Sequence, residues 1–228
     1  MANQAIVPPA WEGKHAIKDL PFDPSSLPGL SERLLTSHWQ NNYGGAVKRL
    51  NLIEAQIASL APDAPPFMLG ALKREELIAS NSMALHELYF ANLGGSSGPS
   101  PGLMDAIAAS FGNFAIWERE FRSIGAALAG GSGWVVLNYH LQSGLLRNSW
   151  AGDHAQNLAH GVPVLVMDMY EHSYAMDYGA NAAQYIATFM DNVNWLEVAR
   201  RFDRVASHLK GGEMTVSKAE PAERLGDD

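Results

Sequence analysis

Four side chains in this sequence have the types and the spacing to hold a metal ion. His38 and His86 each fall on a helix face that otherwise reads as apolar, so they are candidates for a buried pair of imidazoles. Asp168 follows a strand-like apolar run, and His172 comes four residues later. Because a carboxylate and an imidazole at the end of a buried strand can converge on one point, both are further candidate ligands. A single buried histidine is usually structural, so the prediction depends on the combination.

The composition restricts which metal and which partners such a site can have. The chain has 228 residues, no cysteine and a formal net charge of −8. Without thiolate ligands, an ion must be held by nitrogen and oxygen, which favours manganese, iron or zinc. The acidic balance argues against a broad phosphate-binding surface, so nucleic acid is not an expected partner.

The N-terminal sequence predicts neither an export signal nor a membrane anchor. It lacks the positively charged region and the following apolar run of a secretory signal. The apolar run before Asp168, at residues 162–167, is far too short to cross a bilayer. We therefore expect a soluble, cytoplasmic protein that does not associate with a membrane.

The elements that carry the two early histidines read as a helical hairpin. Proline recurs within the first thirty or so residues and predicts an extended arm. Apolar residues at spacings of three and four then predict helices at about 30–60 and 72–93, which the proline-rich stretch 61–66 separates. Gly44 and Gly45 weaken the first helix in its middle and predict a kink there. The two helices are expected to pack antiparallel.

The second half of the chain predicts a mixed domain. A Gly- and Ser-rich linker at 94–102 marks a boundary between domains. The pattern then predicts helices at 100–112, 114–128 and 182–209, and strands at 134–141, 145–149 and 163–167. We expect an α+β fold, with a hairpin domain at 1–94, an α/β domain at 100–210 and a disordered tail at 211–228.

A longer pattern around the candidate ligands resembles a known family. The stretch DMYEHSYAMDY, residues 168–178, is similar to the signature of the iron/manganese superoxide dismutases. Further matches follow in the order that the family has them: LPFDPSSLPGLS, AIAASFGNF, GSGW and NVNW. Together these matches span nearly the whole chain except its C-terminal tail.

The resemblance implies a fold, a ligand set and a reaction. The fold is a helical-hairpin domain followed by an α/β domain with a small antiparallel sheet of three strands. One iron or manganese ion lies between the domains, held by His38, His86, Asp168 and His172. The implied reaction converts the superoxide anion to oxygen and hydrogen peroxide.

The resemblance also implies roles for residues around the ion. His154 would contact solvent bound to the metal, and Trp134 and Tyr170 would form aromatic walls that exclude water. Glu171 would reach a metal-binding histidine of a second subunit, and Tyr174 would approach the same interface. The family relation therefore implies self-association, as a homodimer or a tetramer.

Several positions near the site depart from the family pattern. Asn42 and Ala46 stand where the family usually has a histidine and a tyrosine, and Ala182 stands where it has an arginine. Such residues deliver protons and steer the anion, so their loss threatens the rate more than metal binding. The sequence thus leaves open a metal-binding protein of the same fold without dismutase activity, for example a metal store or sensor.

Two other classes of protein fit the sequence less well. A mononuclear iron oxygenase or hydrolase uses two histidines and one carboxylate, whereas this chain offers a third histidine. A purely structural helical dimer would leave the four ionisable groups without a role. The sequence does not choose between iron and manganese, because both accept these ligands.

Overall fold

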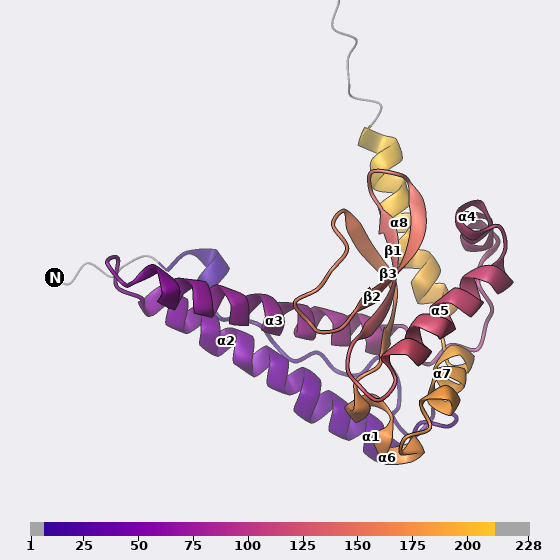
Figure 1. Cartoon of the computed structure of the whole chain (residues 1–228), viewed down its shortest axis with the longest axis horizontal. Coiled ribbons are helices and arrows are strands. Elements are labelled where there is room, and N and C mark those ends of the chain that lie inside the picture. Colours follow the sequence, from indigo (N-terminus) through magenta and orange to yellow (C-terminus); the bar gives the residue numbers. More distant parts are fainter. Residues whose placement is uncertain (1–6, 213–228) are drawn as a thin grey trace, which may run out of the picture.

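The computed structural model describes residues 7–212, with side chains to residue 207 (Figure 1). The prediction of a disordered tail at 211–228 concerns residues that lie outside this range, apart from Gly211 and Gly212 at the end of the last helix. A short 3₁₀ turn, η1 (Pro9–Trp11), precedes an extended arm that runs along the helical hairpin. Within residues 7–212, no helix is long and apolar enough to cross a membrane.

The first predicted helix is a continuous helical rod with a π-helical segment in its middle. It comprises α1 (Glu32–Ser37), the π segment η2 (His38–Tyr43) and α2 (Gly44–Ser59). Ser31 caps its start, because the Ser31 side chain accepts a hydrogen bond from the Leu34 amide. The irregularity predicted near the two glycines is therefore a π segment that begins at His38, where such insertions often mark functional sites.

The second hairpin helix, α3 (Pro66–Ala91), begins six residues earlier than the predicted start at 72. The proline-rich stretch before it was read as a terminator. Proline is well tolerated in the first turn of a helix, where its missing N–H has no partner to lose. Pro66 therefore starts the helix. α2 and α3 pack antiparallel, as predicted, and project away from the rest of the molecule (Figure 1).

Three antiparallel strands form the predicted sheet, in the order β2-β1-β3. They are β1 (Trp134–His140), β2 (Leu145–Ala151) and β3 (Gly161–Asp168), each within two residues of its predicted bounds. In the register of the central pair, Trp134 lies opposite Asp168. The first residue of β1 and the last residue of β3 therefore lie side by side at one end of these strands.

The remaining helices surround this sheet. They are α4 (Pro101–Phe111), α5 (Phe114–Leu128), η3 (Glu171–Ser173), α6 (Ala175–Tyr178), α7 (Ala182–Asp191) and α8 (Trp195–Gly212). The single helix predicted at 182–209 is wrong, because it is two helices. Asn194 accepts a hydrogen bond from the Glu197 amide and so caps a new helix.

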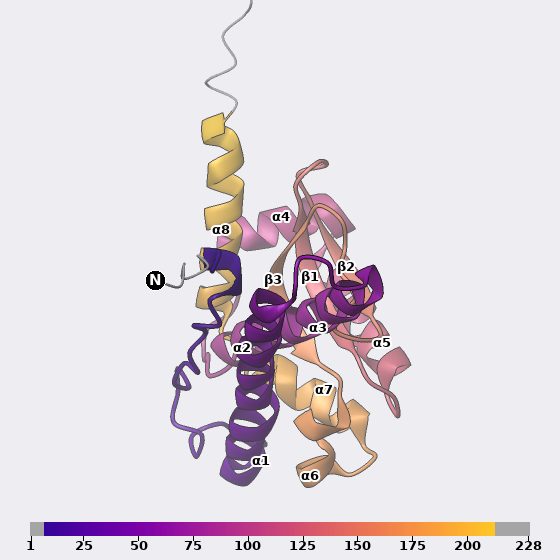
Figure 2. The same cartoon turned by 90° about the vertical axis from the view of Figure 1, so that its left-hand side faces the viewer.

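The hairpin and the sheet share one apolar core. In two views at right angles, α3 lies against one side of the sheet, and α4, α5 and α8 lie on the other (Figures 1 and 2). The main cluster of buried side chains includes Leu35 and Tyr89 of the hairpin together with Trp117 and Val164. The α+β fold is confirmed. Its two predicted domains are joined by continuous packing.

A buried polar network also fixes the hairpin against the sheet. Asn92, just after α3, accepts from the Val166 amide at 3.0 Å and donates to the Val166 carbonyl at 3.1 Å. Arg201 of α8 donates to the carbonyl of Leu88 at 3.0 Å and to that of Val164 at 3.3 Å. Paired in this way, the end of α3 and strand β3 hold a fixed relative position, which sets the geometry of the side chains described below.

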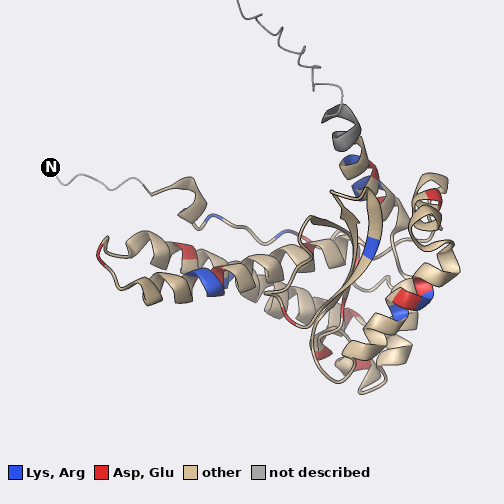
Figure 3. Cartoon of the chain, turned by 45° about the horizontal axis from the view of Figure 1, so that its top comes forward, with Lys and Arg blue, Asp and Glu red and all other residues tan. Residues whose placement is uncertain are grey.

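Surface charges of both signs are interspersed along the hairpin and α5 (Figure 3). Arg49 of α2 pairs with Glu75 of α3, for example, and so links the two hairpin helices at their surface. Exposed pairs of this kind contribute little stability each. Because both signs are mixed along these helices, they do not present a strongly charged binding face.

Candidate metal centre

The four predicted ligands converge on one point. The ligand atoms of His38, His86, Asp168 and His172 all lie within 4.8 Å of one another. The Nε2 atoms of the three histidines lie 3.1, 3.6 and 3.2 Å, in that order, from the same Asp168 oxygen, Oδ2. Three imidazoles therefore face one carboxylate oxygen.

Each ligand reaches this point because of the element that carries it. His38 begins the π segment, His86 lies in α3, and Asp168 is the last residue of β3. After the strand, Ser173 donates to the carbonyl of Asp168 at 2.9 Å and so turns the chain sharply. This turn brings His172 back towards the strand end.

Burial sets the protonation states that a metal site needs. Desolvation lowers the pKa of His38 and lowers the pKa of His86 to about 3, so both imidazoles are neutral. Burial alone would raise the pKa of Asp168, but His172 and His38 outweigh it and hold that pKa well below its usual value. Neutral imidazole and ionised carboxylate are the forms that bind metal.

Hydrogen bonds fix the direction of the free ligand atoms. Nδ1 of His86 lies 2.6 Å from the carbonyl oxygen of Ser82, which can only accept, so Nδ1 carries the proton and Nε2 a free lone pair. The other Asp168 oxygen, Oδ1, accepts from the Tyr170 amide at 2.8 Å. Oδ2 is thereby left to face the imidazoles.

The buried polar atoms of this cluster test whether an ion fits. Within the described residues, both ring nitrogens of His38 and Nε2 of His86 are buried without a hydrogen-bond partner. A buried nitrogen without a partner is costly, and two of these atoms point at the common centre. Three nitrogens and one oxygen also match the ligand preference of iron and manganese. The residues fit one such ion.

Comparison with known proteins identifies the family. A sequence model described as iron/manganese superoxide dismutases, C-terminal domain, matches residues 99–201. A protein of Cupriavidus metallidurans named superoxide dismutase (Fe) is 54% identical over 189 residues, which cover 82% of this chain and 96% of the relative. This chain belongs to the iron/manganese superoxide dismutases.

More distant relatives include proteins named for the other metal. Superoxide dismutase (Mn) 1 of Halobacterium salinarum is 30% identical over 201 residues, covering 86% of this chain and 99% of the relative. Superoxide dismutase (Mn) 2 of Haloferax volcanii is 32% identical over 196 residues, covering 83% and 96%. Membership of the superoxide dismutase family therefore leaves the choice between iron and manganese open.

The three residues predicted to surround the ion form one aromatic group. The indole N–H of Trp134 points to Nδ1 of His154 at 3.0 Å, and the His154 ring stacks on Tyr170 with a centroid distance of 4.7 Å. The ring of His154 lies 6.2 Å from that of His86. Burial lowers the pKa of His154 and raises that of Tyr170 to about 12. An uncharged imidazole that accepts at Nδ1 carries its proton on Nε2.

The two residues predicted at a subunit interface differ in their exposure. Glu171 is exposed beside His172. Tyr174 is 1% exposed within a single chain and stacks on Tyr185 with a centroid distance of 5.2 Å. Tyr174 therefore already belongs to the core of one subunit.

The positions that depart from the superoxide dismutase pattern lie in or near the core. Ala46 and Ala182 are buried, so neither presents a polar group. Tyr43, which neighbours Asn42, does not replace the missing tyrosine, because its hydroxyl is otherwise engaged. It accepts from the Lys18 amide at 2.9 Å and donates to Glu87 at 3.0 Å.

Sequence reasoning missed Tyr185, which supports the carboxylate ligand. Its hydroxyl donates to the carbonyl of Asp168 at 2.7 Å and lies 3.3 Å from the hydroxyl of Tyr89. Tyr185 lies on α7, and no local spacing relates that helix to β3. Only its place three residues after Ala182, where the family usually has an arginine, could have suggested a role near the site.

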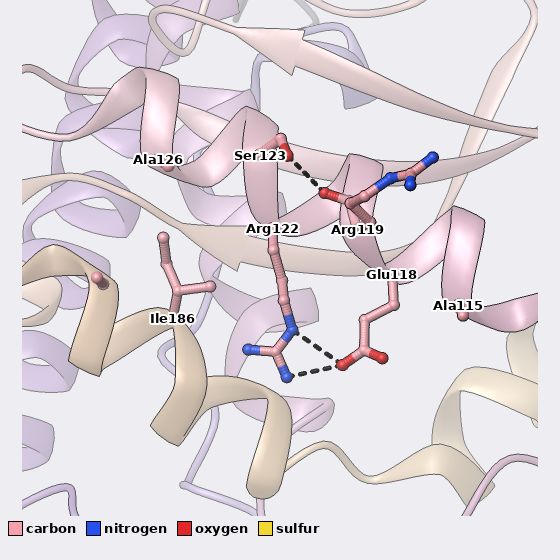
Figure 4. A pocket seen from close by; sticks show the side chains of 8 residues that line it. Ala115, Glu118, Arg119, Arg122, Ser123, Ala126 and Ile186 are labelled. Carbon is pink, nitrogen blue, oxygen red and sulfur yellow. Dashed lines mark hydrogen bonds and ion pairs between the residues drawn. The ribbon is translucent and has the colours of Figure 1, made fainter.

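A surface depression lies away from the four convergent residues. It has a volume of about 500 Å³ and lies between α5 and α7, where Arg122 donates to Glu118 at 2.7 and 2.9 Å (Figure 4). Ile186 of α7 faces these side chains from the opposite wall. None of the four convergent residues lines this depression, so its size does not make it the reactive site.

Proposed function

We propose that this protein is a superoxide dismutase with one iron or manganese ion held by His38, His86, Asp168 and His172. The overall reaction takes two superoxide anions and two protons to one molecule of oxygen and one of hydrogen peroxide. The observation that carries the proposal is the convergence of three imidazoles on one buried carboxylate oxygen, in a chain of this family.

The ligand set suits an anionic substrate. When bound, the ion supplies the chemistry by alternating between its +3 and +2 states. The protein contributes a single negative charge, from Asp168, so the site as a whole keeps a positive charge that attracts superoxide. Trp134, fully buried, closes one side of the site and keeps bulk water out.

We assign His154 the part of a hydrogen-bond donor towards the reacting centre. Trp134 holds its Nδ1, and Tyr170 fixes the plane of its ring. The N–H at Nε2 is then available to hold or pass a proton beside the ion. Trp134 and Tyr170 act by orienting His154 and by excluding water.

A metal store or sensor of the same fold is the weaker alternative. His38, His86 and Asp168 are each no more than 1% exposed, whereas a store must release its ion readily. The relation to the superoxide dismutase of Cupriavidus metallidurans also favours the enzyme.

The two functions are separated by measuring superoxide consumption on protein loaded stoichiometrically with iron or with manganese. We expect consumption far above that of the same concentration of free metal ion. Metal-loaded protein that consumes superoxide no faster than the free ion would leave only the metal-binding alternative.

One ring nitrogen of His172 lacks a hydrogen-bond partner in the described part of the chain, and this supports a homodimer. Within the described residues, Nδ1 of His172 has no hydrogen-bond partner, and its side chain is 25% exposed. Metal-binding histidines almost always donate their second N–H to an acceptor. We propose that Glu171 of a second subunit is this acceptor, with Tyr174 beneath the same interface.

We place the enzyme in the cytoplasm, which fractionation of the source cells would test.

Replacing Glu171 by Ala tests this dimer. The variant loses the acceptor for a largely desolvated imidazole, so we expect dimer affinity to fall by about tenfold or more. Sedimentation at low protein concentration measures this. An unchanged dimer would contradict the assignment, and Asp191→Ala, at the end of α7, provides an exposed acidic control.

A further inference from the structure

A second cavity lies between α3 and the sheet, next to the metal centre. It has a volume of about 270 Å³. Val136 and Asn138 of β1 line it, on the face of the strand that also carries Trp134, because alternate residues of a strand share a face. Leu85 and Leu88 of α3 form the opposite wall. None of the residues that line this cavity is ionisable, in contrast to the metal centre.

Asn138 contributes to this cavity a hydrogen-bond acceptor that has no protein donor. The residue is 3% exposed, and its amide nitrogen donates to the Val136 carbonyl at 3.2 Å and to the Ser149 hydroxyl at 2.7 Å. Because a carbonyl can only accept, these contacts fix which way the amide points. Its oxygen, Oδ1, accepts no hydrogen bond from the described part of the chain. A Cβ placed on Gly161, which also lines the cavity, would lie 3.0 Å from Oδ1.

An irregularity in the sheet lies at Asn138. The pairing of β1 with β3 shifts register between Leu137 and Asn138, so Asn138 lies opposite Pro163. Proline has no N–H to give, and a bulge separates the strands locally. The backbone of Asn138 pairs with Arg147 on the other side, and its side chain stands out of the plane of the sheet, where the cavity lies.

We propose that this cavity binds a small neutral molecule with an apolar body and one hydroxyl or amide N–H, which donates to Oδ1 of Asn138. The mostly aliphatic walls favour the apolar body, and the absence of ionisable lining residues disfavours a charged ligand. The hydrogen bond satisfies an acceptor that is otherwise left without a protein donor.

Occupancy of the cavity is also linked to His154. Asn81 lines the cavity and donates to the carbonyl of His154 at 2.6 Å. Gln156 lines it too and accepts from the Gly152 amide at 2.7 Å. Two of the hydrogen bonds that hold the loop around His154 therefore come from residues of the cavity wall, so a ligand that displaces either residue moves His154.

Binding of phenol and toluene to the metal-loaded protein tests the site. The two probes have similar size, but only phenol donates a hydrogen bond, so we expect phenol to bind about five- to tenfold tighter in calorimetry. Asn138→Leu should reduce phenol to the affinity of toluene. Ala84 is an exposed lining residue, so Ala84→Trp should block the cavity without disturbing the core and abolish binding of both.

Equal affinities of phenol and toluene for the wild-type protein, or phenol binding that survives in Ala84→Trp, would overturn the proposed site. The link to His154 rests on the proposed function, whereas the binding measurement does not. Saturating phenol should change superoxide consumption of the wild-type protein by about twofold or more and leave that of Ala84→Trp unchanged. Equal effects on both proteins, or no effect on either, would overturn the link while leaving the dismutase assignment intact.

Discussion

In the described part of the chain, histidine side chains meet a carboxylate at two places, and their surroundings give these places different functions. In the N-terminal arm, Nε2 of His15 lies 2.8 Å from Oε1 of Glu54. At the metal centre, Nε2 of His38 lies 3.1 Å from Oδ2 of Asp168. The distances are similar. The exposed fraction of the histidine side chain is 35% in the arm and 0% at the centre.

The two contacts differ most in the hydrogen-bonding capacity that remains. The second oxygen of Glu54 accepts from the Gly13 amide at 2.9 Å, and Asn51 pairs with the backbone of His15 in both directions. Both carboxylate oxygens of Glu54 are therefore hydrogen-bonded, and this His15–Glu54 contact, which we call the clasp, holds the arm against α2. Asp168, in contrast, faces three imidazoles, of which His38 and His86 keep partnerless nitrogens. Unsatisfied buried ligand atoms, more than the residue types, identify the metal site.

The largest effect is expected when the carboxylate of each contact is removed in turn. Asp168→Ala deletes the only anionic ligand, so metal content should fall from about one ion per chain to nearly none. Glu54→Ala should leave the metal content unchanged, although it loosens the arm. Elemental analysis of both purified variants checks this. Stoichiometric iron or manganese in Asp168→Ala would contradict the ligand assignment.

Removing the metal should lower the stability of the fold through the metal centre, whereas the clasp binds no ion and should not be affected. An ion present at about a hundred to a thousand times its dissociation constant stabilises the fold by about 3–4 kcal/mol. Chelation should therefore lower the melting temperature by roughly 6–16 °C for a chain of this size. Calorimetry of the loaded and chelated protein measures the shift. In Asp168→Ala the same chelation should change nothing.

A smaller effect is expected at His154, which lies beside the ion without binding it. His154→Gln retains all four ligands, so metal content should stay nearly normal. Imidazole and amide N–H groups differ as donors, and manganese and iron differ in intrinsic potential, so one substitution cannot suit both equally. The ratio of manganese-supported to iron-supported activity should change by about threefold or more. An identical ratio in parent and variant would place His154 outside the reacting centre.

The smallest effect is expected at the clasp itself. His15→Ala removes a partly exposed hydrogen bond to Glu54, so the free energy of unfolding should fall by about 1 kcal/mol. Metal content and superoxide consumption should not change. Denaturant unfolding, with the metal-loaded parent as reference, gives the difference. A loss of metal in this variant would show that the arm and the centre are coupled.

Local sequence determined the elements and most of their bounds. The helix at 114–128 and the strand that ends near Asp168 follow from periodicity and capping, which are properties of neighbouring residues. The same reasoning failed at Pro66, where proline begins a helix, and at 192–194, where one predicted helix is two. Both failures concern ends of helices, where propensity is weakest.

The family resemblance selected the four residues whose side chains converge in the structure, but residue type alone did not. The chain has eight histidines, and His15 also meets a carboxylate. The spacing of four between Asp168 and His172 is common in proteins that bind no metal. Only their order relative to His38 and His86, over most of the chain, distinguished them from ordinary buried residues.

Tertiary structure alone decided what supports and adjoins the site. Arg201 and Asn92 lock α3 to β3, and Tyr185 reaches Asp168 from a helix beyond the ligand. The amide of Asn138 lines a cavity whose walls come from α3, β1 and the loop after β2, and no sequence pattern predicted that cavity. These contacts join residues far apart in the chain, where periodicity carries no information. The sequence thus determined which groups could bind an ion, and the packing of hairpin against sheet decided that their free lone pairs meet.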